Sequence, residues 1–215
     1  MININELLDI VKKKYTLTPI NTAAYDNLKV KGMKFDIKAF KADRLGHVSI
    51  MNASVFLGLM KMDTLIINPI ELDLPLYSYD RILAMGNDTL ITEMYDTMVV
   101  KNTFESLDSV IAKYTHLPKR DAGKHWYDDI KLSQSISFKG KKDISSDFDN
   151  LSIEHLKSFL DTPASQVTDF DTKKALALRY VNGLLENGGP STDVFVKGIG
   201  KVATEELFHK ILFGV

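Results

Sequence analysis

The spacing of hydrophobic residues changes twice along the chain, from helical to strand-like and back to helical. Near the start, apolar residues at 4, 7, 8 and 11 recur at helical spacing, and Asn3 is a suitable N-cap, so we predict a helix over residues 3–14. From Met33 to Ala39 every second residue is apolar, which is typical of a strand with one buried face. Residues 43–46 indicate a turn, and residues 47–51 a returning strand.

The central third of the chain predicts further strands. The apolar residues 55–62 and 64–68 are interpreted as one strand with a bulge, which ends at Pro69. Two apolar runs, 72–85 and 89–95, flank the sequence Gly86-Asn87-Asp88, and this arrangement indicates a β-hairpin. Alternating apolar residues over 132–138 predict one more strand.

Helical spacing returns on both sides of this last strand. It predicts helices over 103–115, 151–160 and 172–187, the last of which ends at Gly188-Gly189-Pro190. Two shorter helices fit residues 191–199 and 203–213. Strands in the middle and helices at the ends indicate the α+β class, an α/β/α sandwich whose central, mainly antiparallel sheet is flanked by helices. No composition shift marks a second domain, so we expect one domain over residues 1–215.

Composition narrows the function classes. The chain has 45% hydrophobic and 26% charged residues, which is ordinary for a globular protein. Its 27 basic and 28 acidic residues give a net charge of −1, so we expect neither nucleic acid nor an acidic membrane as a partner. No apolar run is long enough for a membrane span, and the first residues lack the pattern of a secretory signal, so we expect a cytoplasmic protein.

Several kinds of bound cofactor have no support in the sequence. The chain has no cysteine, which removes thiolate zinc sites, iron–sulfur clusters and catalytic thiols. The five histidines lack metal-ligand spacing, and the glycine-rich motifs of nucleotide sites are absent, so we expect no metal and no bound cofactor. If the protein performs redox chemistry, its electrons come from a separate carrier.

Asp80 is the most conspicuous candidate for chemistry. It interrupts the apolar first strand of the predicted hairpin, and a buried carboxylate is costly unless it is paired or functional. In a pocket, loss of solvent would raise its pKa and let it hold a proton near neutral pH. The alternative is an Asp on the solvent face with a cross-strand partner, and periodicity alone favours that alternative.

Other polar residues are weaker candidates. Glu93 and Asp96 are three residues apart on the returning strand, so they face opposite sides and do not form a carboxylate pair. The cluster His125-Trp126-Tyr127 either lines a pocket for a flat ligand or anchors a loop on the core.

Two segments resemble the ferredoxin-dependent bilin reductases. The first is Asp63-Thr-Leu-Ile-Ile-Asn-Pro69 followed by Asp73-Leu-Pro-Leu-Tyr-Ser-Tyr-Asp80-Arg-Ile-Leu. In that family an apolar strand ends in Pro, a Leu-Pro turn follows, and the next strand carries an aromatic residue, a small residue and an Asp. The second segment, Phe195-Val-Lys-Gly-Ile-Gly200 with Thr204 to Phe213, is similar to the family's last helices.

The resemblance implies a fold and an activity. Members of the family are α/β/α sandwiches that bind a linear tetrapyrrole, such as biliverdin, between the sheet and the C-terminal helices. They reduce it with electrons from ferredoxin and carry no metal or organic cofactor. Asp80 would be the central Asp that donates a proton to the pigment, because electrons added to a conjugated tetrapyrrole build up negative charge that positioned protons must neutralise.

The sequence also departs from the family pattern. Asp63 stands where several members have His or Asn, and we assign it as a helper of Asp80. Gly189 stands before Pro190 where a second functional Asp is expected, and Asp193 lies close enough in sequence to substitute for it. A chain that keeps Asp80 without the other acid reduces a different double bond, acts on a different tetrapyrrole, or only binds one.

The remaining predicted site residues are contacts to the substrate. Candidates for the propionate groups are basic residues beside predicted strands, and Tyr79 and Met94 are expected to touch the pigment. These basic residues are Lys38, Arg44 and Lys139. Three functions stay open at this point: a bilin-reductase-like oxidoreductase, a tetrapyrrole-binding protein without turnover, and a fold relative with no tetrapyrrole role.

Overall fold

The computed structural model describes residues 1–55 and 59–215 and is built around one antiparallel sheet. Eight strands are present in the described residues, in the order β1-β3-β4-β5-β6-β7-β8, with β2 paired to β3. The strands are β1 (Leu17–Ile20), β2 (Lys29–Val30), β3 (Met33–Ala42), β4 (Gly46–Val55), β5 (Met60–Pro69), β6 (Leu76–Ala84), β7 (Asn87–Tyr95) and β8 (Ile136–Lys141).

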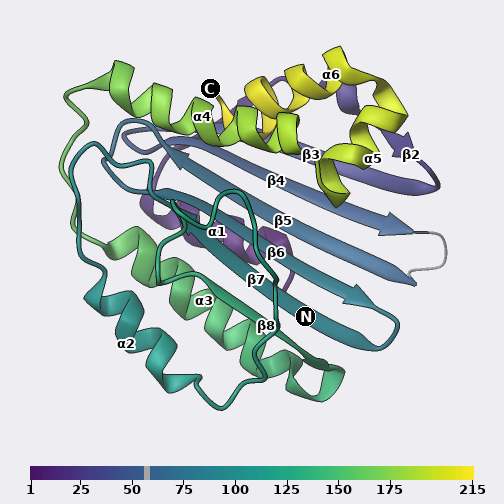
Figure 1. The fold of residues 1–215 in the computed structure, drawn as a ribbon, viewed down its shortest axis with the longest axis horizontal. Coiled ribbons are helices and arrows are strands. Elements are labelled where there is room, and N and C mark those ends of the chain that lie inside the picture. Colours follow the sequence, from purple (N-terminus) through teal and green to yellow (C-terminus); the bar gives the residue numbers. More distant parts are fainter. Residues whose placement is uncertain (56–58) are drawn as a thin grey trace.

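Helices cover both faces of the sheet, which confirms the predicted α/β/α sandwich (Figure 1). On one face lie α1 (Ile4–Lys14), α2 (Glu105–Lys113) and α3 (Ser145–Asp161), which bury one large apolar cluster. A second cluster joins the other face to α4 (Phe170–Asn187), α5 (Pro190–Ile199) and the π-helical segment η4 (Leu207–Phe213), and the short helix α6 (Lys201–Glu206) connects α5 to η4. Single helical turns η1 (Ala23–Tyr25) and η3 (Lys142–Ile144) connect these elements.

The opening helix begins where the sequence predicts. Asn3 accepts a hydrogen bond from the backbone of Asn5, and the Glu6 side chain accepts one from the Asn3 backbone, so the first turn carries a capping box. Ile4, Leu7, Leu8 and Val11 are buried against the sheet. The apolar residues that predicted the helix are therefore the ones that attach it to the core.

The single bulged strand predicted over residues 55–68 is wrong. β4 ends at Val55 and β5 begins at Met60, and the two strands pair antiparallel from Gly46 with Pro69 to Ser54 with Lys61. Residues 56–58, which fall within the predicted strand, lie outside the described residues. Most residues from 55 to 62 are apolar, so hydrophobic spacing alone gave no signal that one strand ends and another begins.

The predicted hairpin of β6 and β7 is confirmed, although its turn lies one residue earlier than expected. Ala84 pairs with Asn87, which leaves Met85 and Gly86 as a two-residue turn. Both have positive φ, 52° and 76°, as a type I′ turn requires. This register fixes which side chains of the hairpin share a face.

The edges of the sheet differ most from the predicted pattern. The expected strand over 132–138 begins only at Ile136, because Ser135 donates a backbone hydrogen bond to Leu132 and closes a turn there. β1 and β2 were not predicted. They contain four and two residues, too few for a periodic pattern.

Side chains of the sheet hold the C-terminal segment in place. His47, Ser49 and Asn68, from β4 and β5, hydrogen-bond to carbonyl oxygens of residues 211, 212 and 213 at 2.7–2.8 Å. These bonds satisfy backbone oxygens at the end of a helix, where intrahelical partners are missing. They also fix η4 over the sheet, so that Phe208 and Leu212 point toward the cavity described next.

Candidate functional site

A cavity of about 390 Å³ lies between the sheet, the C-terminal helices and the segment 120–127. Side chains alternate across a strand, so one set of residues on β5, β6 and β7 faces this space. The volume is within the range of about 300–1,000 Å³ typical of small-molecule sites. The sheet contributes Met51, Met62, Thr64, Ile66, Ser78, Asp80, Ile82, Ile91, Glu93 and Tyr95, and the other side includes Arg120, His125, Trp126, Tyr127, Tyr180, Gly188, Gly189, Thr192, Phe195, Phe208, Leu212 and Phe213.

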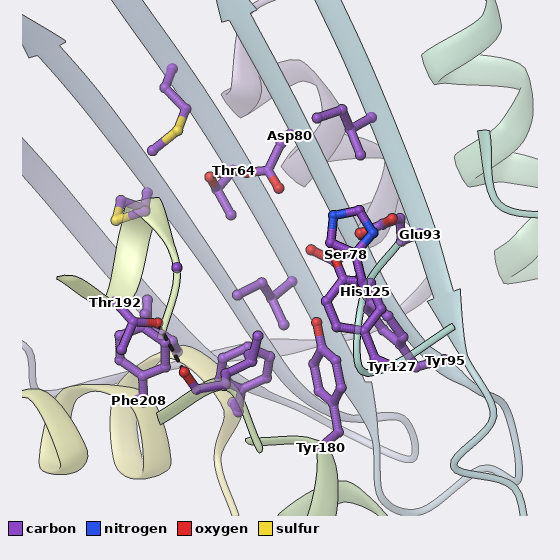
Figure 2. Close-up of a pocket in the computed structure, with 18 of the residues that line it drawn as sticks. Thr64, Ser78, Asp80, Glu93, Tyr95, His125, Tyr127, Tyr180, Thr192 and Phe208 are labelled. Atoms are coloured by element: carbon purple, nitrogen blue, oxygen red, sulfur yellow. Dashed lines mark hydrogen bonds between the residues drawn. The ribbon is translucent and has the colours of Figure 1, made fainter. Parts of the chain in front are cut away.

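Asp80 lies at the centre of the sheet side of this pocket, paired across the strands with Thr64 (Figure 2). The Thr64 hydroxyl donates a hydrogen bond of 2.5 Å to the Asp80 carboxyl. Burial raises the pKa of Asp80 to about 6; the Thr64 hydrogen bond acts in the opposite direction, and the charge of Glu93 adds to the rise. Near neutral pH this carboxyl can therefore both hold and release a proton.

Glu93 is the second carboxyl that lines the pocket. The Tyr95 hydroxyl donates a hydrogen bond of 2.6 Å to one of its oxygens. The Lys131 ammonium group lies 3.8 Å from the other oxygen and 2.9 Å from Asp128, which is exposed. Glu93 is thus connected to the protein surface by a short chain of charged groups.

Tyrosine rings form one wall of the pocket. Tyr95 and Tyr180 stack with ring centroids 4.0 Å apart, and Tyr127 meets Tyr95 edge-on at 5.3 Å. The ring of His125 lies parallel to that of Tyr127 at 4.9 Å (Figure 2). Burial raises the pKa of Tyr95 and Tyr180 well above the ordinary value, so both hydroxyls stay neutral. Such a wall suits a flat, conjugated ligand.

The segment from Pro118 to Lys131 passes over β7 and β8 and closes this side of the pocket. Backbone bonds attach it to the sheet edge, from Arg120 to Ser137 and from Asp96 to Ile130. The Trp126 ring packs on α4 where Gly183 leaves room for it: a Cβ at this glycine would lie 2.2 Å from the ring.

Arg120 contributes a positively charged side chain to the pocket. Its guanidinium group makes a long hydrogen bond of 3.3 Å to the Ser137 hydroxyl. Within the part of the chain that the structure describes, it is the one Arg or Lys that lines the cavity, and no carboxylate lies within salt-bridge distance of it. It is therefore free to bind an acidic group of a ligand.

The structure separates Asp63 from Asp80. Asp63 is adjacent to Thr64 on β5, so its side chain leaves the opposite face of the sheet. There it is hydrogen-bonded by the Asn52 side chain, and burial raises its pKa. The geometry does not let it assist Asp80 at a shared ligand.

Tyr79 and Met94 also point away from the pocket. Both belong to the apolar cluster under α1, α2 and α3, where Tyr79 is 1% exposed and Met94 is fully buried. Consecutive residues of a strand face opposite sides of the sheet. Tyr79, next to Asp80, therefore faces away from the pocket, as Asp63 does next to Thr64. In this structure the two residues are part of the core.

The predicted propionate ligands are likewise apart from the cavity. Lys38 is exposed on β3 near Asp36, and Arg44 is exposed in the turn between β3 and β4. Lys139 lies on β8 opposite Thr89, exposed and outside the lining residues. Asp193 is exposed on α5 and also does not line the pocket, whereas Gly189 does.

Sequence reasoning missed most of the pocket around Asp80. Thr64, Tyr180 and Arg120 carried no local signal, since each resembles an ordinary strand, helix or loop residue. Glu93 was identifiable: it lies on the same face of the hairpin as Asp80 once the two-residue turn is placed correctly. The cluster at 125–127 was recognised, and all three residues line the cavity.

Across residues 1–55 and 59–215, no group of three His, Cys, Asp or Glu side chains is placed to hold a metal ion. In the same described ranges, no helix is both long and apolar enough to cross a membrane.

Comparison with known proteins shows a similarity in fold but none in sequence family. No protein-family model matches the sequence, and no curated protein matches it. Among solved structures, the chain is similar to phytochromobilin synthase from tomato, which was crystallised in complex with biliverdin. The TM-score is 0.73 at 14% sequence identity, and the match covers 95% of this chain and 79% of the tomato chain.

Proposed function

We propose that this protein binds a linear tetrapyrrole in the pocket around Asp80 and reduces it. The observation that carries the proposal is Asp80 itself, a carboxyl with its pKa raised to about 6 on the sheet side of a largely apolar cavity. The tomato enzyme with the same fold binds biliverdin, which supports this class of ligand by analogy.

The chemistry requires an acid of this kind. Reduction of one double bond adds two electrons and two protons to the pigment, and each added electron makes the conjugated system more basic. A positioned acid whose pKa is near the working pH transfers a proton most effectively at that moment. Asp80 would donate one of the two protons.

The other parts of the pocket fit the same ligand. A tetrapyrrole is flat and conjugated, and it would lie against the tyrosine wall formed by Tyr95, Tyr127 and Tyr180. Its propionates carry negative charge, and we propose that Arg120 binds one of them in place of the basic residues expected from the sequence.

We further propose that the electrons come from a separate one-electron carrier such as ferredoxin. The chain has no cysteine with which to hold an iron–sulfur cluster of its own. A carrier that delivers one electron at a time matches a site that supplies protons individually.

The proposal is tested first by absorption spectroscopy. Biliverdin mixed with excess protein should show a shifted and altered long-wavelength band; an unchanged spectrum would exclude the ligand class. Reduced ferredoxin is then added without oxygen, and the bound pigment should convert to a product that absorbs at shorter wavelength. Stable binding without conversion would make the protein a tetrapyrrole carrier.

A further inference from the structure

A two-electron reduction needs a second proton, and the C-terminal region does not supply it. Gly189, before Pro190, lines the pocket without a side chain. The nearby acid Asp193 is exposed and is not a lining residue. Among the described residues that line the cavity, only Asp80 and Glu93 carry a carboxyl group.

Glu93 lies on the same face as Asp80 and close to it. Asp80 pairs with Ile91 across the hairpin, and Glu93 is two residues further along that strand. Diagonal neighbours of this kind lie about 7–8 Å apart, near enough to act on one ligand from two positions. Figure 2 shows both carboxyls on the sheet side, and Ser78, two residues before Asp80 on β6, pairs directly with Glu93 on β7.

The two carboxyls differ in their access to solvent protons. Within the described part of the chain, the hydrogen-bond partner of Asp80 is the neutral hydroxyl of Thr64, and no charged side chain is paired with this carboxyl. Glu93 instead adjoins Lys131, which is partly exposed and is bound to the surface carboxylate of Asp128. Protons from water can therefore reach Glu93 by way of Lys131, whose ammonium nitrogen lies 3.8 Å from the carboxyl.

We infer that Glu93 is the second catalytic acid, which takes a proton from the surface by way of Lys131 and transfers it to the half-reduced pigment. The inference rests on the proposed function. The balance is complete: the carrier supplies two electrons, Asp80 supplies one proton and Glu93 supplies the other. Glu93 is reprotonated through Lys131 during turnover, and Asp80 is reprotonated by water that enters the pocket after the product leaves. The Tyr95 hydroxyl holds one oxygen of Glu93 and leaves the other for this exchange.

The test uses Glu93→Gln in the full-length protein. Gln keeps the size of the side chain and still accepts the Tyr95 hydrogen bond, but it cannot carry a proton. We expect biliverdin affinity within about threefold of wild type and product formation slowed about 100-fold or more, the usual contribution of a general acid. A one-electron-reduced pigment radical should accumulate and be detectable by electron paramagnetic resonance.

Glu154→Gln is the matched control. Glu154 also accepts hydrogen bonds from a lysine, Lys113, and a tyrosine, Tyr114, but it lies on α3 at the opposite face of the sheet. Its replacement should leave the rate unchanged.

The outcomes separate the two proposals. Wild-type protein that neither binds nor reduces biliverdin refutes the proposed function. Wild-type turnover with equally fast turnover in Glu93→Gln refutes only the role of Glu93. Loss of biliverdin binding in Glu93→Gln also refutes it, because the residue would then serve binding or folding.

Discussion

Replacing Asp80 by Asn should make the protein more stable at neutral pH, although it removes the proposed acid. Burial raises the pKa of Asp80 from 3.8 to about 6, so the folded state binds this proton more tightly than the unfolded chain does. Wild-type stability therefore decreases as the pH rises from about 4 to about 6, where the unfolded chain releases the proton first. At about 1.4 kcal/mol per pKa unit, the full loss is about 3 kcal/mol.

The Asn side chain escapes this loss because it has no charge, and its oxygen still accepts the Thr64 hydrogen bond. For a chain of this length, about 3 kcal/mol corresponds to an increase of about 6–12 °C in Tm. The assay is thermal unfolding followed by circular dichroism at pH 4 and at pH 8. The difference between the variant and wild type should be small at pH 4 and reach its full size above pH 7.

Asp36→Asn is the control, since Asp36 is also a strand aspartate but is exposed on β3. Its effect on Tm should not change with pH in the same way. A difference for Asp80→Asn that is equal at both pH values would refute the argument that burial raises the pKa of Asp80.

Three further predictions concern the pocket. Thr64→Val removes the hydrogen bond that favours the charged carboxylate, so the pKa of Asp80 should rise by about one unit, measured by infrared titration of the carboxyl; a constant pKa would contradict this. Gly183→Ala should displace the ring of Trp126, the chain's single tryptophan, shift its fluorescence and cost about 1–3 kcal/mol; an unaltered emission spectrum would count against this packing. Arg120→Gln should weaken biliverdin binding about tenfold but leave binding of biliverdin dimethyl ester unchanged; equal losses for both ligands would exclude a contact with the propionates.

The fold was largely predictable because most of its elements carry a clear period. The helical apolar spacing after the N-cap Asn3 and the alternation from Met33 identified a helix and a strand that the structure contains. The break between β4 and β5 was not predictable from hydrophobicity, because most residues from 55 to 62 are apolar. The short strands β1 and β2 were also not predicted, because two to four residues are too few to show a hydrophobic period.

The site was predictable only where the sequence itself carried the signal. Asp80 was identified because a carboxyl in an apolar strand is unusual, and it does face a pocket. Asp63 was assigned as a helper from its place in the family resemblance, and Tyr79 was expected to touch the pigment, whereas strand alternation sends both side chains to the opposite face. Arg120 comes from a connecting segment whose path over the sheet is set by tertiary contacts, so no local pattern indicates it.

The central claim is that Asp80 gives a proton to a bound tetrapyrrole. The most direct measurement mixes biliverdin and reduced ferredoxin, without oxygen, with either wild-type protein or Asp80→Asn and follows the pigment's absorbance. We predict that both proteins bind biliverdin with similar affinity, and that only wild type converts it, with the variant slowed about 100-fold or more. Conversion by Asp80→Asn at the wild-type rate would contradict the account.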